Sequence, residues 1–534
     1  MTRVAVNAPL PPVEGSDPPL PPPPRPLLRA SASAPGKIIL FGEHSVVHGR
    51  PAIAASLSDL RIHVLVEARS DGLVSVSMPD LKSDDHPGGV SGTFDAGSMR
   101  LPWVDGAPRA GGEGGLPLPT AEDAARIRAA LMDASVPPLP SSSAPRHGIL
   151  DETALSALTP LTYLINVLVP SLLTSAPSSS DVGGGGGERV GEGEGKGRGI
   201  SVTVQSADLP VGAGLGSSAA FGTSLAAALH RLRSLLRAEE EEEDSRSDDI
   251  DCGGGGRPRR RIRPRPDCCP SPPDLDEIDS LSFRSETLVH GSPSGIDNAV
   301  SCRGGAVYFV KDLSAGGAVR MESLDLPVLD MILTHTGVPR STRGLVEAVG
   351  AFRAGFPGVV DRTFDAVGAI VDEFRRLVTS SSSTATRTTE EEVHRKVSKL
   401  IRANMHLLRM WGVSHPSLDA ICAVTDSLYE TTRCSTKLTG AGGGGCAFTF
   451  LERAKGESDS ELRIRAERVR SAIKSRGNEE YGGGGGMGEW AFQCFESEVG
   501  GPGVLWTDPN EFPRSAVVGA RGVPLASEAA AMPA

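Results

Sequence analysis

The sequence predicts an α+β protein of two domains that is interrupted by low-complexity segments. Its 534 residues are enough for two or three ordinary domains. Apolar segments with strand and helix periodicity alternate along the chain. The 64 glycines and 42 prolines gather in a few polar stretches, so the ordered part should be clearly shorter than the whole chain.

The low-complexity stretches set the expected domain limits. Residues 1–29 form a proline-rich tail that cannot bury a core, and 506–534 form a C-terminal tail. Polar, glycine-rich or charged inserts are too flexible to offset their ordering entropy, so we expect them to be disordered; they lie at about 177–198, 238–275, 379–392 and 477–488. We therefore predict an N-terminal domain over 30–320 and a C-terminal domain over 321–505.

Between the inserts, each apolar segment has a recognisable period. Residues 154–173 are apolar but are interrupted by Pro160 and Pro170, which favours a buried helix over a membrane span. The remaining signals follow the two-residue and 3.6-residue periods: we expect strands at 201–204 and 305–310, and helices at 219–232 and 393–411.

The charge balance and the cysteines indicate a cytoplasmic protein. The formal net charge is −12, which gives no general attraction to nucleic acid or to an anionic membrane. A basic run at 257–265 is interpreted as a solvated loop, with a nucleic-acid tract as the alternative. No signal peptide is expected, because the first 30 residues lack an apolar core segment. The eight cysteines show no C-x-x-C spacing, which favours reduced thiols over zinc ligation.

The most informative motif is D-L-P-V-G-A-G-L-G-S-S-A-A at 208–220. Gly212, Gly214 and Gly216 allow the backbone to approach a ligand closely, and the predicted helix follows directly. A glycine turn that enters a helix N-terminus suits a polyphosphate, and Ser217 or Ser218 could cap the helix or bind Mg²⁺. The alternative is a plain glycine turn before a capped helix. The motif is neither a Walker A loop nor a Rossmann loop.

A second glycine loop at 440–445 matches G-x-G-x-x-G by letter. It leads into Cys446–Phe450, which has the composition of a strand and not of a helix. We therefore expect a glycine hairpin that brings backbone amides near a ligand, and not a dinucleotide site.

Candidate catalytic groups lie in two further segments. Glu286 and Asp297 lie eleven residues apart, and Asp297 follows a turn-rich stretch. Phosphoryl transfer to an alcohol needs one carboxylate near the hydroxyl and another for the metal. Lys37 is expected in a tight turn that enters an apolar strand, with Glu43 and His44 after a second glycine turn. Taken singly, these residues are more typical of solvated or capping carboxylates and of a surface lysine.

Together, three segments resemble the GHMP kinase family. They are A-P-G-K…G-E-H at 34–44, P-V-G-A-G-L-G-S-S-A-A at 210–220 and K-L-T-G-A-G-G-G-G at 437–445, and they occur in the family's order. Within that family the chain resembles the mevalonate kinases most, through residues 42–49, 290–300 and 338–343. The resemblance covers about 30–175, 199–236, 280–378 and 393–475, and it implies the two-domain GHMP kinase fold with the active site in the cleft between the domains.

The resemblance also implies roles for individual residues. Asp297 would be the general base, and Lys37 would polarise the acceptor hydroxyl and contact phosphate. The ATP site would comprise Lys37, Gly212, Ala213, Gly214, Leu215, Gly216, Ser217, Ser218 and Asp80. Ser218 and Glu286 would bind Mg²⁺. Glu43, His44 and Thr342 would bind the acceptor. The second glycine loop, with Gly440, Gly442, Gly443 and Gly444, would close over the site.

The implied activity is ATP-dependent phosphorylation of the C5 hydroxyl of (R)-mevalonate, a step in isoprenoid and sterol biosynthesis. The resemblance further implies a homodimer and inhibition by prenyl diphosphates. Two alternatives remain at this point. One is another GHMP kinase that acts on phosphomevalonate or a sugar, and the other is a non-catalytic sensor that binds ATP and a metabolite on the same fold.

Overall fold

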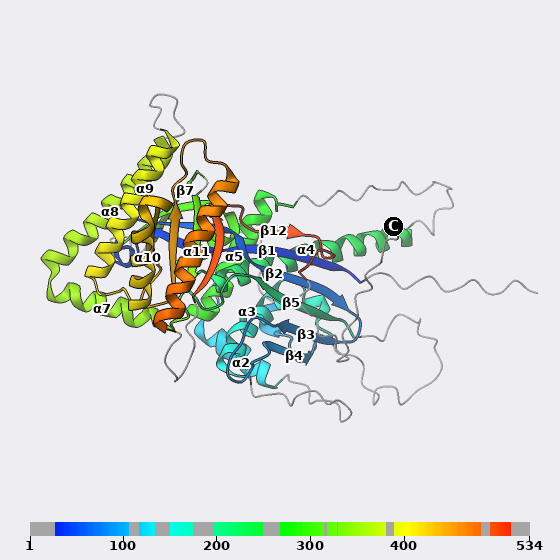
Figure 1. The fold of residues 1–534 in the computed structure, drawn as a ribbon. Helices are drawn as coiled ribbons and strands as arrows, with labels where there is room; N and C mark the ends of the chain where they lie inside the picture. The colour runs from blue at the N-terminus through cyan, green and yellow to red at the C-terminus, as the bar shows by residue number, and fades with distance from the viewer. Residues whose placement is uncertain are drawn as a thin grey trace, which may run out of the picture.

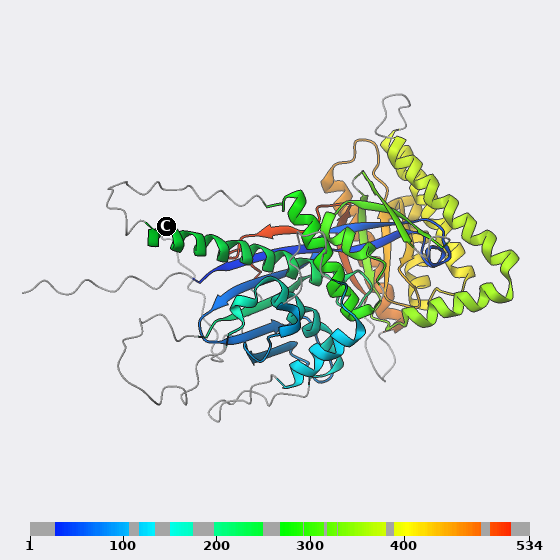
Figure 2. The same cartoon turned by 180° about the vertical axis from the view of Figure 1, so that it is seen from behind.

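The structure is a computed structural model that describes residues 27–105, 117–133, 150–174, 197–248, 268–291, 293–313, 318–327, 329–380, 389–481 and 492–513. Its helices and strands form two lobes (Figures 1 and 2). The proline-rich residues 1–26, the basic run at 257–265 and residues 514–534 lie outside the described part.

The first lobe is formed mostly by the blue to green part of the chain in Figure 1. Its strands are β1 (Arg29–Phe41), β2 (Ala52–Arg69), β3 (Leu73–Met78), β4 (Val90–Asp95), β5 (Gly199–Ala207), β6 (Ala306–Asp312), β7 (Ala318–Leu324) and β12 (Leu505–Thr507). Its helices are η1 (Ser45–His48), α1 (Pro102–Asp105), α2 (Ala121–Asp133), α3 (Glu152–Leu168), η2 (Pro170–Leu172), α4 (Ser217–Asp248), α5 (Pro272–His290) and α6 (Ile296–Arg303).

The second lobe follows β7 along the chain. It contains β8 (Leu329–His335), β9 (Cys434–Thr439), β10 (Cys446–Leu451) and β11 (Gln493–Val499), with α7 (Thr342–Gly355), α8 (Pro357–Ser380), α9 (Glu390–Met410), α10 (Pro416–Thr432) and α11 (Asp459–Tyr481). The paired strands run in the order β11-β8-β10-β9, all antiparallel.

Strand β2 connects the lobes. It pairs with β1, β5 and β6 in the first lobe, and its Leu57 pairs with Val499 of β11 in the second. One apolar core runs from Val64 and Leu229 in the first lobe to Leu333 and Phe448 in the second. The two lobes thus share a sheet and a core.

The predicted mixture of helices and strands is confirmed. Residues 201–204 lie within β5, and 305–310 overlap β6. Residues 219–232 lie within the longer α4, and 393–411 lie within α9 except for residue 411. Residues 154–173 form the buried helix α3 and the short η2. No helix in the described ranges has the length and apolar character needed to span a membrane.

The boundaries of several inserts were wrong. The acidic run Glu239–Asp244 continues α4 as far as Asp248, and α5 starts already at Pro272 with a capping box between Ser271 and Asp274. α8 and α9 cover the ends of the 379–392 segment, and α11 continues to Tyr481. The predicted limits at 320/321 and 505/506 fall inside β7 and β12. Residues 177–196, 249–267, 381–388 and 482–488 of these inserts lie outside the described part of the chain.

Candidate active site

The first glycine loop joins the end of β5 to the start of α4. Gly212, Gly214 and Gly216 have φ angles of 76°, 79° and 73°, a region that favours glycine. Between them, Ala213 and Leu215 are buried in the core and anchor the loop. Because the first turn of a helix carries N–H groups without intrahelical partners, the loop and α4 form an arrangement suited to a polyphosphate.

Two of these glycines allow cationic side chains to reach the loop. A Cβ at Gly216 would lie 2.7 Å from Cγ of Lys37, and a Cβ at Gly214 would lie 1.4 Å from Nη2 of Arg340. Arg340 comes from the second lobe and donates from Nη2 to the carbonyl of Ala213 at 3.1 Å. Side chains at these positions would therefore displace positive charge from the loop.

The sequence predicted Lys37 in a tight turn, but the residue lies within β1. The β1–β2 pairing shifts register between Pro35 and Lys37, which is a β-bulge or similar irregularity. The Lys37 N–H donates to Leu215 of the glycine loop at 2.8 Å. Nζ of Lys37 lies 3.3 Å from Oδ1 of Asp297, whose side chain is 43% exposed against 9% for the lysine. The lysine is thus held in place beside an accessible carboxylate.

Ser218 and Glu286 form a second oxygen pair at the start of α4. Oγ of Ser218 donates to Oε1 of Glu286 at 2.5 Å. Burial raises the pKa of Glu286, Ser218 and His290 oppose that rise, and Asp297 adds to it. The Asp297 and Glu286 carboxylates therefore belong to one cluster.

The Ser218 hydroxyl and the Glu286 carboxylate fit a hard divalent cation. Such ions prefer oxygen ligands, and at nucleotide sites they take the remaining ligands from phosphates and water. Within the described ranges, no group of three or more His, Cys, Asp or Glu side chains could hold a metal ion on its own. A cation shared with a nucleotide is consistent with both observations.

Glu43 and His44, which were predicted to bind the acceptor, are both buried. The Glu43 side chain is 1% exposed and pairs with Nζ of Lys437 from β9. His44 has a φ of 59°, and its Nε2 lies 2.8 Å from the carbonyl of Ala441 in the second glycine loop. Burial lowers the pKa of His44, which favours the neutral imidazole.

The second glycine loop is a hairpin between β9 and β10, as predicted. Gly440, Gly442, Gly443 and Gly444 all have positive φ. The Gly443 N–H donates to Val413 at 2.8 Å, and the Gly445 N–H donates to Val338 at 3.2 Å. A Cβ at Gly440 would lie 3.3 Å from Nη1 of Arg340, so this arginine contacts both glycine loops.

Two further predicted residues are exposed. Thr342 is exposed at the start of α7, two residues after Arg340. Asp80 is exposed beyond β3 and accepts a hydrogen bond from the N–H of Ser206 at 2.8 Å. Asp80 is therefore tied to the strand that enters the first glycine loop.

Sequence reasoning missed Arg340 and Lys437. Arg340 lies in the segment 338–343 and Lys437 in the segment 437–445, both of which carry the family resemblance, and this placement was the available signal. Their partners are 127 and 394 residues away, and local patterns do not predict such contacts.

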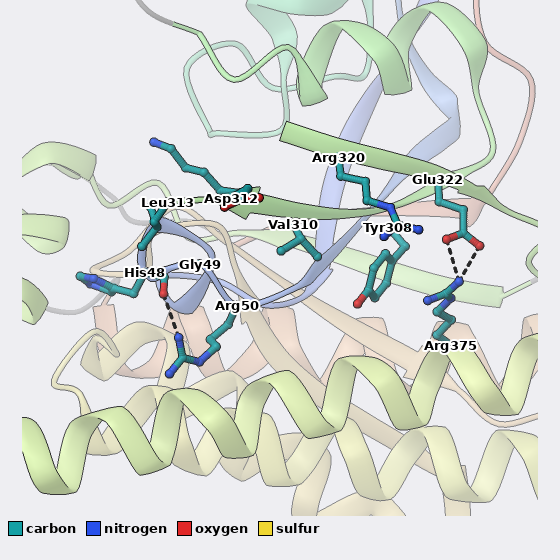
Figure 3. A pocket seen from close by; sticks show the side chains of 11 residues that line it. His48, Gly49, Arg50, Tyr308, Val310, Asp312, Leu313, Arg320, Glu322 and Arg375 are labelled. Atoms are coloured by element: carbon teal, nitrogen blue, oxygen red, sulfur yellow. Dashed lines mark hydrogen bonds and ion pairs between the residues drawn. The ribbon is translucent and has the colours of Figure 1, made fainter. Parts of the chain in front are cut away.

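A pocket of about 480 Å³ lies apart from this cluster, between the β6–β7 hairpin, the η1 segment and α8 (Figure 3). Val307 and Phe309 of β6 pack with Ile296 of α6, the helix that carries Asp297. Successive strand residues face opposite sides, so Tyr308 faces away from α6, and its hydroxyl donates to Asp372 of α8 at 3.1 Å. The pocket and Ile296 of the helix that carries Asp297 thus lie on opposite faces of β6.

Comparison with known proteins finds GHMP kinases and, among them, mevalonate kinases. Residues 188–244 match the family model described as the GHMP kinases N terminal domain. Mouse mevalonate kinase is 32% identical over 88% of this chain and 93% of its own length, and the human enzyme is 30% identical over the same shares. The crystal structure of L. major mevalonate kinase in complex with R-mevalonate gives a TM-score of 0.51 at 18% identity, covering 90% of this chain and 98% of that one; this likeness bears on the fold.

Proposed function

Because this chain belongs to the mevalonate kinase family of GHMP kinases, and is thus a kinase that transfers phosphate to an alcohol, we propose that it transfers the γ-phosphate of ATP to the C5 hydroxyl of (R)-mevalonate. The observation that carries the proposal is the cluster at the first glycine loop. It joins Lys37 to Asp297 and Ser218 to Glu286. A positive group, an accessible carboxylate and two oxygen ligands meet where a polyphosphate would bind.

The chemistry follows from these positions. Asp297 accepts the proton of the C5 hydroxyl, and that oxygen attacks the γ-phosphorus in line. The bond between the γ-phosphorus and the bridging oxygen breaks, and ADP leaves. Lys37 lowers the cost of negative charge on the attacking oxygen and on the phosphate. Glu43, His44 and Thr342 are proposed to orient the acceptor, and Asp80 to contact the nucleotide.

Ser218 and Glu286 are proposed to hold Mg²⁺, which when bound neutralises phosphate charge. The phosphates would be held by backbone N–H groups of the first glycine loop, from Gly212 to Ser217. Gly440 to Gly444 would cover the site from the second lobe. A direct transfer without a phosphoenzyme is expected, and isolation of a stable phosphorylated protein after mixing with ATP alone would contradict it.

The deciding experiment couples ADP release to mevalonate as the sole acceptor, with Asp297→Asn as the variant. We expect mevalonate to drive ADP release and the variant to lose at least about 100-fold in kcat, the low end for removal of a general base. ADP release with phosphomevalonate or a sugar but not with mevalonate would keep the kinase assignment and reject the substrate. ATP binding without turnover on any of these alcohols would favour the sensor alternative.

Three further properties are proposed on family resemblance. The protein would act in the cytoplasm in isoprenoid and sterol biosynthesis, form a homodimer, and be inhibited by prenyl diphosphates. Light scattering of the purified protein tests the dimer, and inhibition assays at several ATP concentrations test the third property.

A further inference from the structure

Among the described strands, none pairs with β1 at Ile39 and Leu40 on the edge that faces away from β2. On one side β1 pairs with β2 along its length, and on the other side β12 covers only Ser31 to Ser33. The β1–β2 register also shifts between Ile39 and Phe41. A backbone edge buried in this way needs other hydrogen-bond partners.

Side chains from β9 supply these partners. Oγ1 of Thr439 accepts from the N–H of Ile39 and donates to its carbonyl, both at 3.1 Å. Nζ of Lys437 donates to the carbonyl of Leu40 at 3.1 Å. One hydroxyl and one ammonium thus replace the ladder that a neighbouring strand would provide.

Lys437 also contacts Glu43, one of the residues proposed to orient the acceptor. Its side chain is 0% exposed, its ammonium pairs with Glu43, and it lies 5.0 Å from the ring centroid of Phe448. His44, next to Glu43, has a left-handed φ and contacts Ala441 of the same hairpin. Residues 37–44 are therefore fixed to the second lobe at four successive points, namely Ile39, Leu40, Glu43 and His44.

We propose that Thr439 and Lys437 are positioning residues that fix the Lys37–His44 segment against the second glycine loop. They act through β1 and the Glu43 turn and touch no reacting atom. The proposal rests on the proposed function, because Lys37 and His44 take their roles from it. Since misplacement of reacting groups by about 1 Å can cost 100-fold in rate, loss of this attachment should lower kcat more than it changes nucleotide binding.

The test compares Thr439→Val, which keeps the shape but removes the hydroxyl, with Thr439→Ser, which keeps the hydroxyl. We expect the valine variant to lose about 10-fold to 100-fold in kcat with little change in KM for ATP, and the serine variant to recover most of that loss. The matched control is Thr449→Val. Thr449 is also buried and lies on the neighbouring strand β10, where it bonds to Thr436 of β9 at 2.7 Å and not to β1. Its kcat should stay near that of the unmodified protein.

Hydrogen exchange at the Ile39 amide provides a readout that needs no substrate. We expect faster exchange in Thr439→Val and near-normal exchange in Thr439→Ser and Thr449→Val. If the unmodified protein does not phosphorylate mevalonate, the proposed function fails while this measurement still tests the attachment. Unchanged exchange in the valine variant, or equal kcat losses in Thr439→Val and Thr449→Val, would overturn the proposal.

The role of Lys437 is tested by stability. Lys437→Met leaves the Glu43 carboxylate buried and unpaired, which is costly, so its urea midpoint should fall. Adding Glu43→Gln removes that charge and should restore part of the midpoint. If the urea midpoint of the double variant is no higher than that of Lys437→Met alone, the two side chains are not coupled, and this part of the proposal is rejected.

Discussion

The contact between Ser218 and Glu286 joins the first turn of α4 to α5 beside the glycine loop. Its 2.5 Å separation places a hydroxyl and a carboxylate where a shared cation would also contact phosphate. Without a cation, burial raises the pKa of Glu286. A bound divalent cation would favour the ionised carboxylate, so metal binding and ionisation of Glu286 should be coupled.

Replacement of this carboxylate by an amide tests the metal role. We expect Glu286→Gln to raise the Mg²⁺ concentration for half-maximal rate by at least about tenfold, since even changes outside the ligand shell cost 10–100-fold. The measurement is the rate as a function of Mg²⁺ at fixed ATP.

Glu277→Gln is the matched control for that experiment. Glu277 lies on the same helix but pairs with Arg233 and His230, so its loss should leave the Mg²⁺ dependence unchanged. Equal shifts in both variants would show that the effect comes from α5 as a whole and not from a metal ligand.

At the scale of single elements, β2 carries a histidine that makes stability depend on pH. Burial, with a contribution from Arg61, lowers the pKa of His63 from 6.5 to about 4. The unfolded chain binds a proton at this histidine below pH 6.5, and the folded chain resists it until about pH 4. The stabilising contribution is therefore fully present above pH 6.5 and is lost as the pH falls from 6.5 toward 4.

His63→Gln should reduce this loss. Between pH 7.5 and pH 5 we expect the unfolding free energy of the unmodified protein to fall by about 2 kcal/mol more than that of the variant. Urea unfolding at both pH values measures the difference, and the other histidines cancel in the comparison. Parallel losses in the two proteins would mean that His63 is protonated equally in the folded and unfolded states.

Elements with a clear period were predictable from the sequence, and their ends were not. The apolar face of residues 219–232 identifies α4, but the acidic run after it has no such face and still continues the helix to Asp248. Helix propensity supports this extension, since glutamate is a good helix former. The polar composition of the same residues had indicated disorder. In charged runs, helix propensity and composition therefore give opposite predictions.

The candidate site was predictable where a motif carries its own geometry. Glycines with positive φ before a helix indicate a phosphate loop, and the structure places Lys37, Asp297, Ser218 and Glu286 around it. The bulge at Lys37 and the contacts of Arg340 and Lys437 depend on strands and loops far apart in the chain. No local periodicity carries that information.

On the scale of the whole molecule, the two lobes are parts of one packed unit. They share a core cluster, and β2 pairs with strands of both. The chain also returns after β11, so that β12 pairs with β1 and the Trp506 N–H donates to the carbonyl of Cys268 at 2.8 Å. Neither lobe can therefore lose its structure without exposing apolar surface of the other.

We accordingly expect both lobes to unfold in a single cooperative transition. Two variants with one tryptophan each can report on them, one keeping Trp411, which packs on Phe364 in the second lobe, and one keeping Trp506, which stacks on His230 in the first. Fluorescence during urea unfolding should give the same midpoint for both, after correction for the effect of each variant on overall stability by circular dichroism. Separate midpoints would show that each lobe holds its structure alone, and the shared core would then contribute little to the attachment of Lys37 to the second glycine loop.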